Sequence, residues 1–230
     1  MHLYGLQKMT LLDFPGHVAC TVFLNACDCR CPFCHNFELI DGTAPALMSE
    51  EEFFGFLEKR HGLLDGVAIT GGEPCLHADL PAFMEKIRAC GFAVKLDTNG
   101  FHPEMLSRIL EENLADYIAM DIKNSPEKYA LTCGLDRVDM KPIEESVSLL
   151  LGGNVEYEFR TTVVREMHDE SDFKKIGKWI CGAKRYFLQK FTDRDTVPFG
   201  NLSAPTRGEL EKYAFLVSNY VNFVALRGVD

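Results

Sequence analysis

The chain has 230 residues, of which 47% are hydrophobic and 25% are charged, so it can bury the core of a globular domain. Its formal charge of −10 argues against a nucleic-acid-binding protein. No run approaches the ~18 apolar residues of a membrane span, and the N-terminus lacks the basic and apolar regions of a secretory signal. We therefore expect a cytoplasmic protein that has neither nucleic acid nor a membrane as a partner.

The nine cysteines are an odd number, which in a cytoplasmic chain favours metal ligands and free thiols over disulfides. No repeat, low-complexity segment or flexible linker divides the sequence. We predict a single domain over residues 1–230.

Short apolar runs rich in β-branched residues alternate with longer amphipathic segments. The predicted strands cover residues 18–24, 67–70, 94–98, 117–121, 157–164, 185–191 and 223–226. The predicted helices cover residues 49–60, 77–89, 103–112, 143–151, 172–181 and 207–219. This alternation predicts an α/β fold with a parallel sheet and outer helices. About six strand–helix units are too few for a closed eight-stranded barrel, so we predict a partial, open (β/α)6 TIM-like barrel.

The first predicted strand leads into the segment CDCRCPFCHN, residues 27–36. Cys27, Cys31 and Cys34 have the spacing C-x3-C-x2-C, and three thiolates this close together can hold an iron–sulfur cluster. Such clusters normally take four cysteines. Three would leave one iron open for chemistry, as catalytic metal sites keep an open coordination position.

A closed metal site is the alternative for this segment. The Cys31-x2-Cys34 pair with His35 and Cys27 could bind structural zinc. Cys20 or Cys75 could also supply a fourth ligand, and Cys29 forms further close pairs with its neighbours. The cysteines alone therefore leave a noncatalytic metal-binding or electron-transfer protein open.

The second predicted strand ends in TGGEP, residues 70–74. Gly71 and Gly72 allow the backbone to turn sharply and to approach a ligand closely. Glu73 is then placed to accept a hydrogen bond from an ammonium group. Taken alone, the segment also fits an ordinary tight turn between a strand and a helix.

The third predicted strand ends in DTNG, residues 97–100. Asp97, Thr98 and Asn99 favour turns and helix caps, which explains the segment without any ligand.

The next strands also carry polar residues near their ends. Asp121 and Lys123 follow the fourth strand, where they would also fit a surface ion pair. Arg160 within the fifth strand needs an acceptor or water, so it points either into a barrel or outward to solvent. Leu188 and Gln189 in the sixth strand are weaker candidates for contacts with a cofactor.

These motifs together resemble the radical S-adenosylmethionine (SAM) superfamily, which combines C-x3-C-x2-C, an aromatic residue before the last cysteine and a downstream GGE motif. The resemblance extends nearly end to end to the glycyl-radical-enzyme activating enzymes, above all to activating proteins of anaerobic ribonucleoside-triphosphate reductase. The segments that carry it are LLDFPG (residues 11–16), TVFLNACDCRCPFCHN (21–36), TGGEP (70–74), DTNG (97–100), MDIK (120–123) and FRTTVV (159–164).

One departure from the related sequences lies in the metal motif. Related sequences commonly read Gly-Cys-Asn-Phe-Arg-Cys, whereas residues 26–31 here read Ala-Cys-Asp-Cys-Arg-Cys. Cys29 thus replaces an aromatic residue, which alters packing beside the cluster and bears on which thiols bind iron.

The resemblance implies that Cys27, Cys31 and Cys34 are the metal ligands and catalytic residues of one 4Fe–4S cluster. It implies a SAM site whose candidate residues are Phe33, Asn36, Gly71, Gly72, Glu73, Asp97, Thr98, Asn99, Asp121, Lys123 and Arg160. No cysteine lies between Cys34 and Cys75, so an inserted second cluster is not expected.

The activity implied is reductive cleavage of SAM to a 5′-deoxyadenosyl radical, which generates a glycyl radical on a partner enzyme. The partner implied is an anaerobic ribonucleoside-triphosphate reductase, with flavodoxin or ferredoxin as the electron donor. A pyruvate formate-lyase-type activator and a small-molecule enzyme similar to 7-carboxy-7-deazaguanine synthase are the alternatives within the superfamily.

Overall fold

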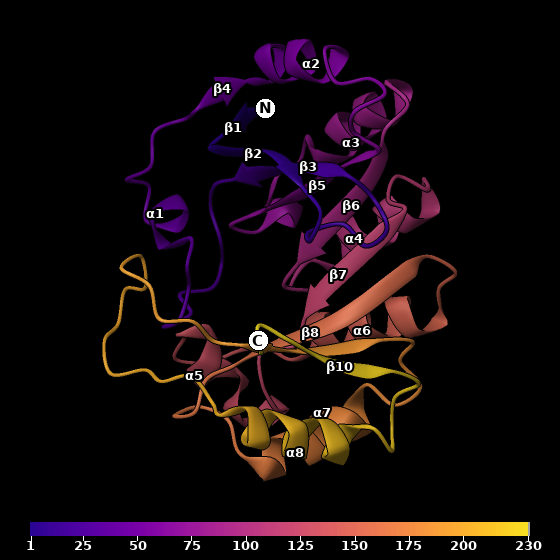
Figure 1. Cartoon of the computed structure of the whole chain (residues 1–230). Helices are drawn as coiled ribbons and strands as arrows, with labels where there is room; N and C mark the ends of the chain where they lie inside the picture. The colour runs from indigo at the N-terminus through magenta and orange to yellow at the C-terminus, as the bar shows by residue number, and fades with distance from the viewer. Residues whose placement is uncertain (230) are drawn as a thin grey trace.

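The computed structural model describes residues 1–229, and a curved eight-stranded sheet dominates them (Figure 1). The strand order is β10-β9-β8-β7-β6-β5-β3-β2. The strands are β2 (Gly5–Thr10), β3 (Ala19–Leu24), β5 (Gly66–Gly71), β6 (Ala93–Thr98), β7 (Tyr117–Asp121), β8 (Glu156–Val163), β9 (Tyr186–Lys190) and β10 (Val224–Arg227). Neighbouring strands from β3 to β10 run parallel, while β2 pairs antiparallel with β3.

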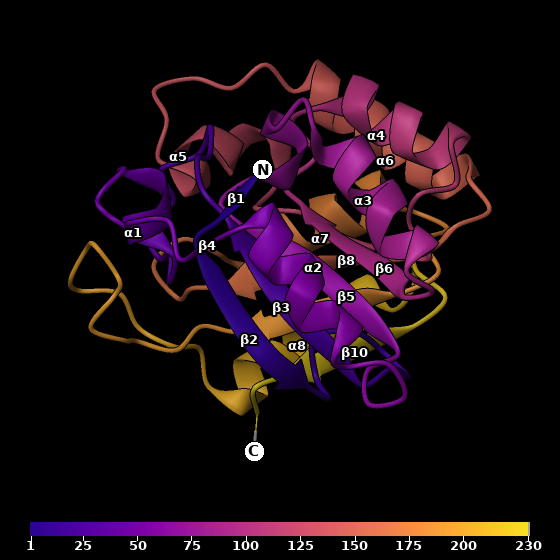
Figure 2. The same cartoon turned by 90° about the horizontal axis from the view of Figure 1, so that it is seen from above.

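Helices connect the parallel strands and lie outside the curve of the sheet (Figures 1 and 2). The longer ones are α2 (Glu50–Glu58), α3 (Leu80–Ala89), α4 (Pro103–Glu111), α6 (Lys141–Gly152), α7 (Glu170–Trp179) and α8 (Arg207–Val217). The short helices are α1 (Phe37–Ile40), α5 (Tyr129–Cys133), η1 (Pro74–Leu76) and η2 (Pro126–Lys128). A small antiparallel pair joins β1 (His2–Leu3) to β4 (Met48–Ser49). None of the helices in residues 1–229 is long and apolar enough to cross a membrane.

The prediction of an open barrel is confirmed, with each predicted strand and helix present within a few residues of its expected ends. β2 and β10 form the two edges of the sheet and do not pair with each other. The sequence analysis missed β2 because its central residues are exposed, which leaves no apolar run to detect. It missed α5 because five residues are too short for a periodic pattern.

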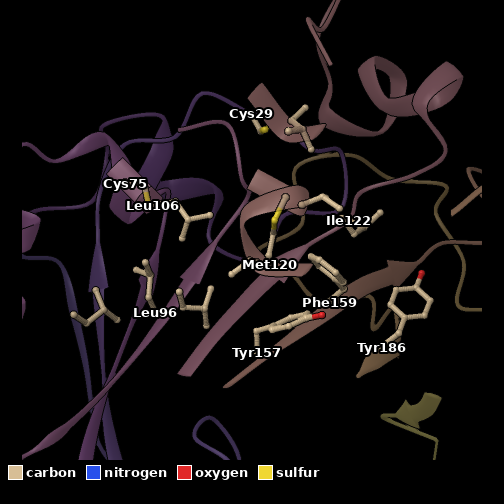
Figure 3. Close-up of a cluster of buried hydrophobic side chains, with 14 of the residues drawn as sticks. Cys29, Cys75, Leu96, Leu106, Met120, Ile122, Tyr157, Phe159 and Tyr186 are labelled. Atoms are coloured by element: carbon tan, nitrogen blue, oxygen red, sulfur yellow. The ribbon is translucent and has the colours of Figure 1, made fainter. Parts of the chain in front are cut away.

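Side chains on the two faces of β6, β7 and β8 differ in character. Leu96, Met120 and Phe159 are fully buried in the main hydrophobic core beneath the helices (Figure 3). Residues one position away along the same strands point to the inner face, because side chains of a strand alternate between faces. Asp97 and Arg160 on that face line cavities inside the barrel.

Candidate active site

The predicted site residues gather in one cavity at the carboxyl ends of the parallel strands. The cavity has a volume of about 210 Å³, and its lining includes every residue that the sequence analysis assigned to the cluster or to SAM. Parallel strands bring their carboxyl ends to one edge of a sheet, so residues distant in sequence meet there. Cys27, Cys31 and Cys34 enter the cavity from the loop after β3.

Backbone carbonyl groups of this metal-binding loop (residues 25–36) are held by Arg30. Its guanidinium Nη1 donates to the carbonyl oxygens of Cys27 at 2.6 Å and Cys29 at 2.8 Å. The backbone N–H of Arg30 donates to the carbonyl oxygen of Cys133 in α5 at 2.8 Å. The backbone N–H of Cys29 donates to the Cys27 sulfur at 3.4 Å. These bonds turn the loop so that its cysteines face the cavity.

Asp28 anchors the other side of the same loop. Its carboxylate accepts hydrogen bonds from Asn99 Nδ2 at 2.6 Å and His102 Nε2 at 2.9 Å. Burial alone would raise the pKa of Asp28, but these two partners outweigh it and lower the pKa. The hydrogen bond to Asp28 raises the pKa of His102. The sequence analysis missed this contact, since Asp28 and His102 lie 74 residues apart.

Gly71 and Gly72 bring the GGE turn against the metal-binding loop. Gly71 has a φ of +118°, and a Cβ atom on Gly72 would lie 1.8 Å from the carbonyl oxygen of Ala26. That same oxygen accepts a hydrogen bond from the backbone N–H of Glu73 at 2.7 Å. Ala26 itself has a left-handed φ of +61°. The close approach that requires Gly72 is therefore to the protein backbone, whereas the sequence analysis assigned it to a ligand.

Glu73 is 1% exposed and joins the GGE turn to the DTNG turn. Its carboxylate accepts hydrogen bonds from Thr98 Oγ1 at 2.8 Å and from the backbone N–H groups of Asn99 at 2.7 Å and Cys75 at 3.0 Å. Burial raises the pKa of Glu73, while these three donors oppose the shift. Thr98 and Asn99 thus hold the Glu73 carboxylate in a fixed orientation within the cavity.

Arg160 lies inside the barrel and links two acidic strand ends. Its Nε donates to Asp121 at 2.9 Å, and its Nη1 donates to Asp97 at 3.1 Å. Lys123 Nζ donates to the second oxygen of Asp121 at 2.9 Å, and Lys95 pairs with Asp97. Burial would raise the pKa of Asp121, but Arg160 and Lys123 lower it to about 2. The outward alternatives for Arg160 and for the Asp121–Lys123 pair are therefore wrong.

Lys95 is a buried charged residue that the sequence analysis missed. Its position two residues before Asp97 was the available signal, because residues i and i+2 of a strand share a face. Gln189 lines a second interior cavity with Arg160, whereas Leu188 is fully buried in the core and outside both cavities.

Of the residues proposed to close the metal site, Cys20 and Cys75 lie elsewhere, whereas His35 and Cys29 line the cavity. Cys20 and Cys75 are buried outside the cavity lining, and burial raises the pKa of the Cys20 thiol to about 12. His35 Nε2 lies 2.7 Å from the carbonyl oxygen of Thr192. Within residues 1–229, the one group of three close metal-ligand atoms comprises Cys27, Asp28 and Cys29, and it includes neither His35 nor Cys31 and Cys34. The structure therefore does not assemble the proposed zinc ligands Cys27, Cys31, Cys34 and His35 at one point.

The donor set fits an iron–sulfur cluster together with a zwitterionic cofactor. Four cysteines line the cavity, Cys29 in addition to the three predicted ligands, and Lys123 is electrostatically coupled to the Cys31 thiol. The same cavity offers carboxylates for an ammonium group and the cations Lys123 and Arg160 for a carboxylate.

Comparison with known proteins agrees with this geometry. The radical SAM superfamily model matches residues 21–180, which span the metal-binding loop and the following strand ends. The chain belongs to the radical SAM superfamily. Enzymes of this superfamily use a 4Fe–4S cluster and SAM, which are therefore the cofactors of this chain.

The similarity of this radical SAM enzyme also extends over its whole length. It is 32% identical to a putative glycyl-radical enzyme activating enzyme of Methanocaldococcus jannaschii, with 98% of this chain and 95% of the relative covered. It is 31% identical to the pyruvate formate-lyase-activating enzyme of Listeria monocytogenes over 55% of each chain. The chain is thus an enzyme of the glycyl-radical-enzyme activating class.

A solved structure shows the same fold. SuiB of Streptococcus suis, bound to the precursor peptide SuiA, superposes with a TM-score of 0.72 at 11% identity. The match covers 90% of this chain and 48% of SuiB.

Proposed function

We propose that this chain generates the glycyl radical of an anaerobic ribonucleoside-triphosphate reductase. The observation that carries the proposal is the convergence of three cysteines, Glu73 and Arg160 in one cavity at the carboxyl ends of the strands. The choice of partner rests on the end-to-end motif resemblance, from the LLDFPG segment (residues 11–16) to the FRTTVV strand (residues 159–164). We treat residues 1–230 as a single catalytic domain.

Cys27, Cys31 and Cys34 would hold the 4Fe–4S cluster, leaving one iron without a cysteine. With flavodoxin or ferredoxin as electron donor, the bound cofactors would supply a 5′-deoxyadenosyl radical by reductive cleavage of SAM, and this radical removes hydrogen from the partner's glycine Cα. The protein contributes binding, orientation and exclusion of side reactions.

The charged residues of the cavity would orient SAM. Glu73, held by Thr98 and Asn99, offers its carboxylate to the methionyl ammonium group. Arg160 and Lys123 offer cations to the methionyl carboxylate, with Asp97 and Asp121 fixing their positions. Each cation already has a partly buried acidic partner, so its orientation is set before SAM arrives.

The remaining cavity residues would shape the pocket. Phe33 is 7% exposed and forms an apolar wall suited to packing against adenine. Asn36 Nδ2 donates to the carbonyl oxygen of Gly71 at 3.2 Å, so it would steady the GGE turn on which Gly71 and Gly72 lie. The unpaired barrel edges leave one side open, which suits access by a polypeptide segment.

The test is electron paramagnetic resonance (EPR) on the anaerobically reconstituted, reduced protein mixed with SAM and the reductase of the same organism. We expect a persistent glycyl doublet on the reductase, with 5′-deoxyadenosine formed in parallel. The doublet should disappear when the C-terminal glycine of the reductase is replaced. Replacing Cys27, Cys31 or Cys34 by Ala should abolish both products.

Other outcomes point to other functions. A 5′-deoxyadenosine product without a doublet would contradict the proposed partner and favour a pyruvate formate-lyase-type or deazaguanine-synthase-like substrate. Absence of both products with an intact cluster would favour a noncatalytic electron-transfer protein. Cleavage that survives all three cysteine substitutions would refute the ligand assignment.

A further inference from the structure

The loop after β7 (residues 121–125) carries Lys123 into the cavity on a backbone held by buried side chains. The carbonyl oxygen of Ile122 accepts a hydrogen bond from Thr161 Oγ1 of β8 at 2.6 Å. Ile122 is fully buried in the hydrophobic cluster drawn in Figure 3. The carbonyl oxygen of Lys123 itself lies 2.9 Å from Nε2 of His168. Side chains from β8 and from the segment after it therefore hold the backbone on which Lys123 lies.

His168 is 3% exposed and lies between β8 and α7. Its Nδ1 lies 3.2 Å from the backbone nitrogen of Val164 and 3.1 Å from the carbonyl oxygen of the same residue. A carbonyl oxygen can only accept, so Nε2 must carry the hydrogen that it donates to Lys123. Burial lowers the pKa of His168, so the ring holds one hydrogen near neutral pH. Nδ1 is then an acceptor, and it accepts the N–H of Val164.

The two residues after Lys123 are polar and fully buried. Asn124 Nδ2 donates to Thr132 Oγ1 in α5 at 2.8 Å and to the carbonyl oxygen of Met167 at 3.0 Å. Ser125 Oγ donates to Asp172 of α7 at 2.8 Å. Hydrogen bonds of buried polar groups largely offset their desolvation, so their main contribution is a fixed geometry. The loop is thus fixed against both α5 and α7.

We propose that His168 is a positioning residue that holds Lys123 in place for the methionyl carboxylate of SAM. The inference rests on the role of Lys123 in the proposed function. Lys123 Nζ donates to Asp121 at 2.9 Å, and both side chains line the cavity. Loss of the His168 hydrogen bond would leave the carbonyl group of Lys123 without its partner and would loosen the loop. SAM binding would then have to order the loop, which weakens its affinity.

Two amide substitutions separate the hydrogen bond to Lys123 from the hydrogen bond to Val164. His168→Gln places its amide NH2 near the position of Nε2, so it keeps the donor to Lys123 but loses the acceptor for Val164. His168→Asn places its amide oxygen near the position of Nδ1, so it keeps the acceptor but loses the donor. Each variant loses one buried hydrogen bond, so urea denaturation should show a similar loss of stability in both.

The affinity for SAM should distinguish the two variants. Anaerobic calorimetry on the full-length, cluster-loaded protein should show a Kd for SAM raised about fivefold in His168→Asn. The donor retained in His168→Gln should keep the Kd within about twofold of wild type. Iron content is measured in each sample, so that a change in cluster loading is not mistaken for a change in affinity.

A double variant tests whether His168 acts through Lys123. Lys123→Met should weaken SAM binding, and adding His168→Asn to it should leave the Kd unchanged from Lys123→Met alone. Nitrogen-15 NMR on the oxidised, cluster-loaded wild type gives a test that needs no variant. The His168 signals should place the ring hydrogen on Nε2.

The proposal is overturned if His168→Asn binds SAM as tightly as wild type, or if His168→Gln is weakened as much as His168→Asn. It is also overturned if the double variant binds more weakly than Lys123→Met, or if the ring hydrogen of His168 lies on Nδ1. An unchanged Kd in Lys123→Met would overturn it together with the role given to Lys123 in the proposed function. The measurements use SAM without a partner enzyme, so absence of a glycyl doublet on the reductase would leave this inference standing.

Discussion

The outer and inner faces of β6, β7 and β8 are built from alternate residues of the same strands, yet they differ in their contributions. The outer face buries Leu96, Met120 and Phe159 beneath the helices, where apolar burial supplies stability. The inner face orders Asp97 and Arg160 in an ion network, where desolvation offsets much of the electrostatic gain. The difference indicates that apolar burial is concentrated on one face and ion pairing on the other, and we propose that the second face orients the cofactor.

A substitution on the outer face should give the largest loss of protein stability. Phe159→Ala removes a fully buried ring and should lower the free energy of unfolding by about 3–5 kcal/mol. Urea denaturation measures this loss, and the folded fraction should bind SAM with unchanged affinity. Phe215→Ala is the control, since Phe215 is 71% exposed in α8 and should cost less than about 1 kcal/mol. A similar cost for both variants would contradict the comparison.

The contribution of the inner-face ion pairs to protein stability should depend on pH. Arg160→Leu removes two charge-assisted hydrogen bonds from the partly buried Asp97 and Asp121 carboxylates, which keep one lysine partner each, and should cost about 2–3 kcal/mol near neutral pH. The pKa of Asp121 is about 2 in the folded wild type, below its ordinary value of 3.8. Its stabilising contribution is therefore present above pH ~4 and is lost as the pH falls toward 2.

In Arg160→Leu, loss of the guanidinium raises the pKa of both acids above their wild-type values, while Lys95 and Lys123 still oppose the effect of burial. Their protonation then relieves the penalty, so the stability difference from wild type should shrink as the pH falls below about 4. Urea titrations at several pH values measure the difference. If the stability difference between wild type and Arg160→Leu did not change with pH, Arg160 would stabilise the protein through packing alone.

At Glu73 the main effect is expected on affinity. Glu73→Gln keeps the shape and removes the charge, and should raise the Kd for SAM about tenfold. Its amide NH2 also leaves at least one of the three buried donors without an acceptor, which should cost about 1–2 kcal/mol of stability. Anaerobic calorimetry of the cluster-loaded protein measures the Kd. Glu85→Gln on the exposed face of α3 is the matched control. An unchanged Kd in Glu73→Gln would remove this carboxylate from the proposed grip on SAM.

Much of the fold and of the cavity lining was predictable from the sequence, because both follow from the regular alternation of strand and helix patterns along the chain. Strand–helix alternation indicates a parallel sheet, and the carboxyl ends of its strands must meet. Contacts between distant segments were not predictable. The Asp28–His102 pair and the packing of Gly72 on Ala26 depend on how loops meet in space, which no local pattern encodes. The orientation of Arg160 likewise depended on which face its strand turns inward.

The packing of Gly72 on Ala26 has a consequence for thermodynamic linkage. It joins the metal-binding loop to the turn that carries Glu73, so anything that orders one segment restrains the other. Cluster loading should therefore strengthen SAM binding beyond direct contact with iron. By reciprocity, SAM should slow the loss of iron from the protein and raise cluster affinity by the same factor.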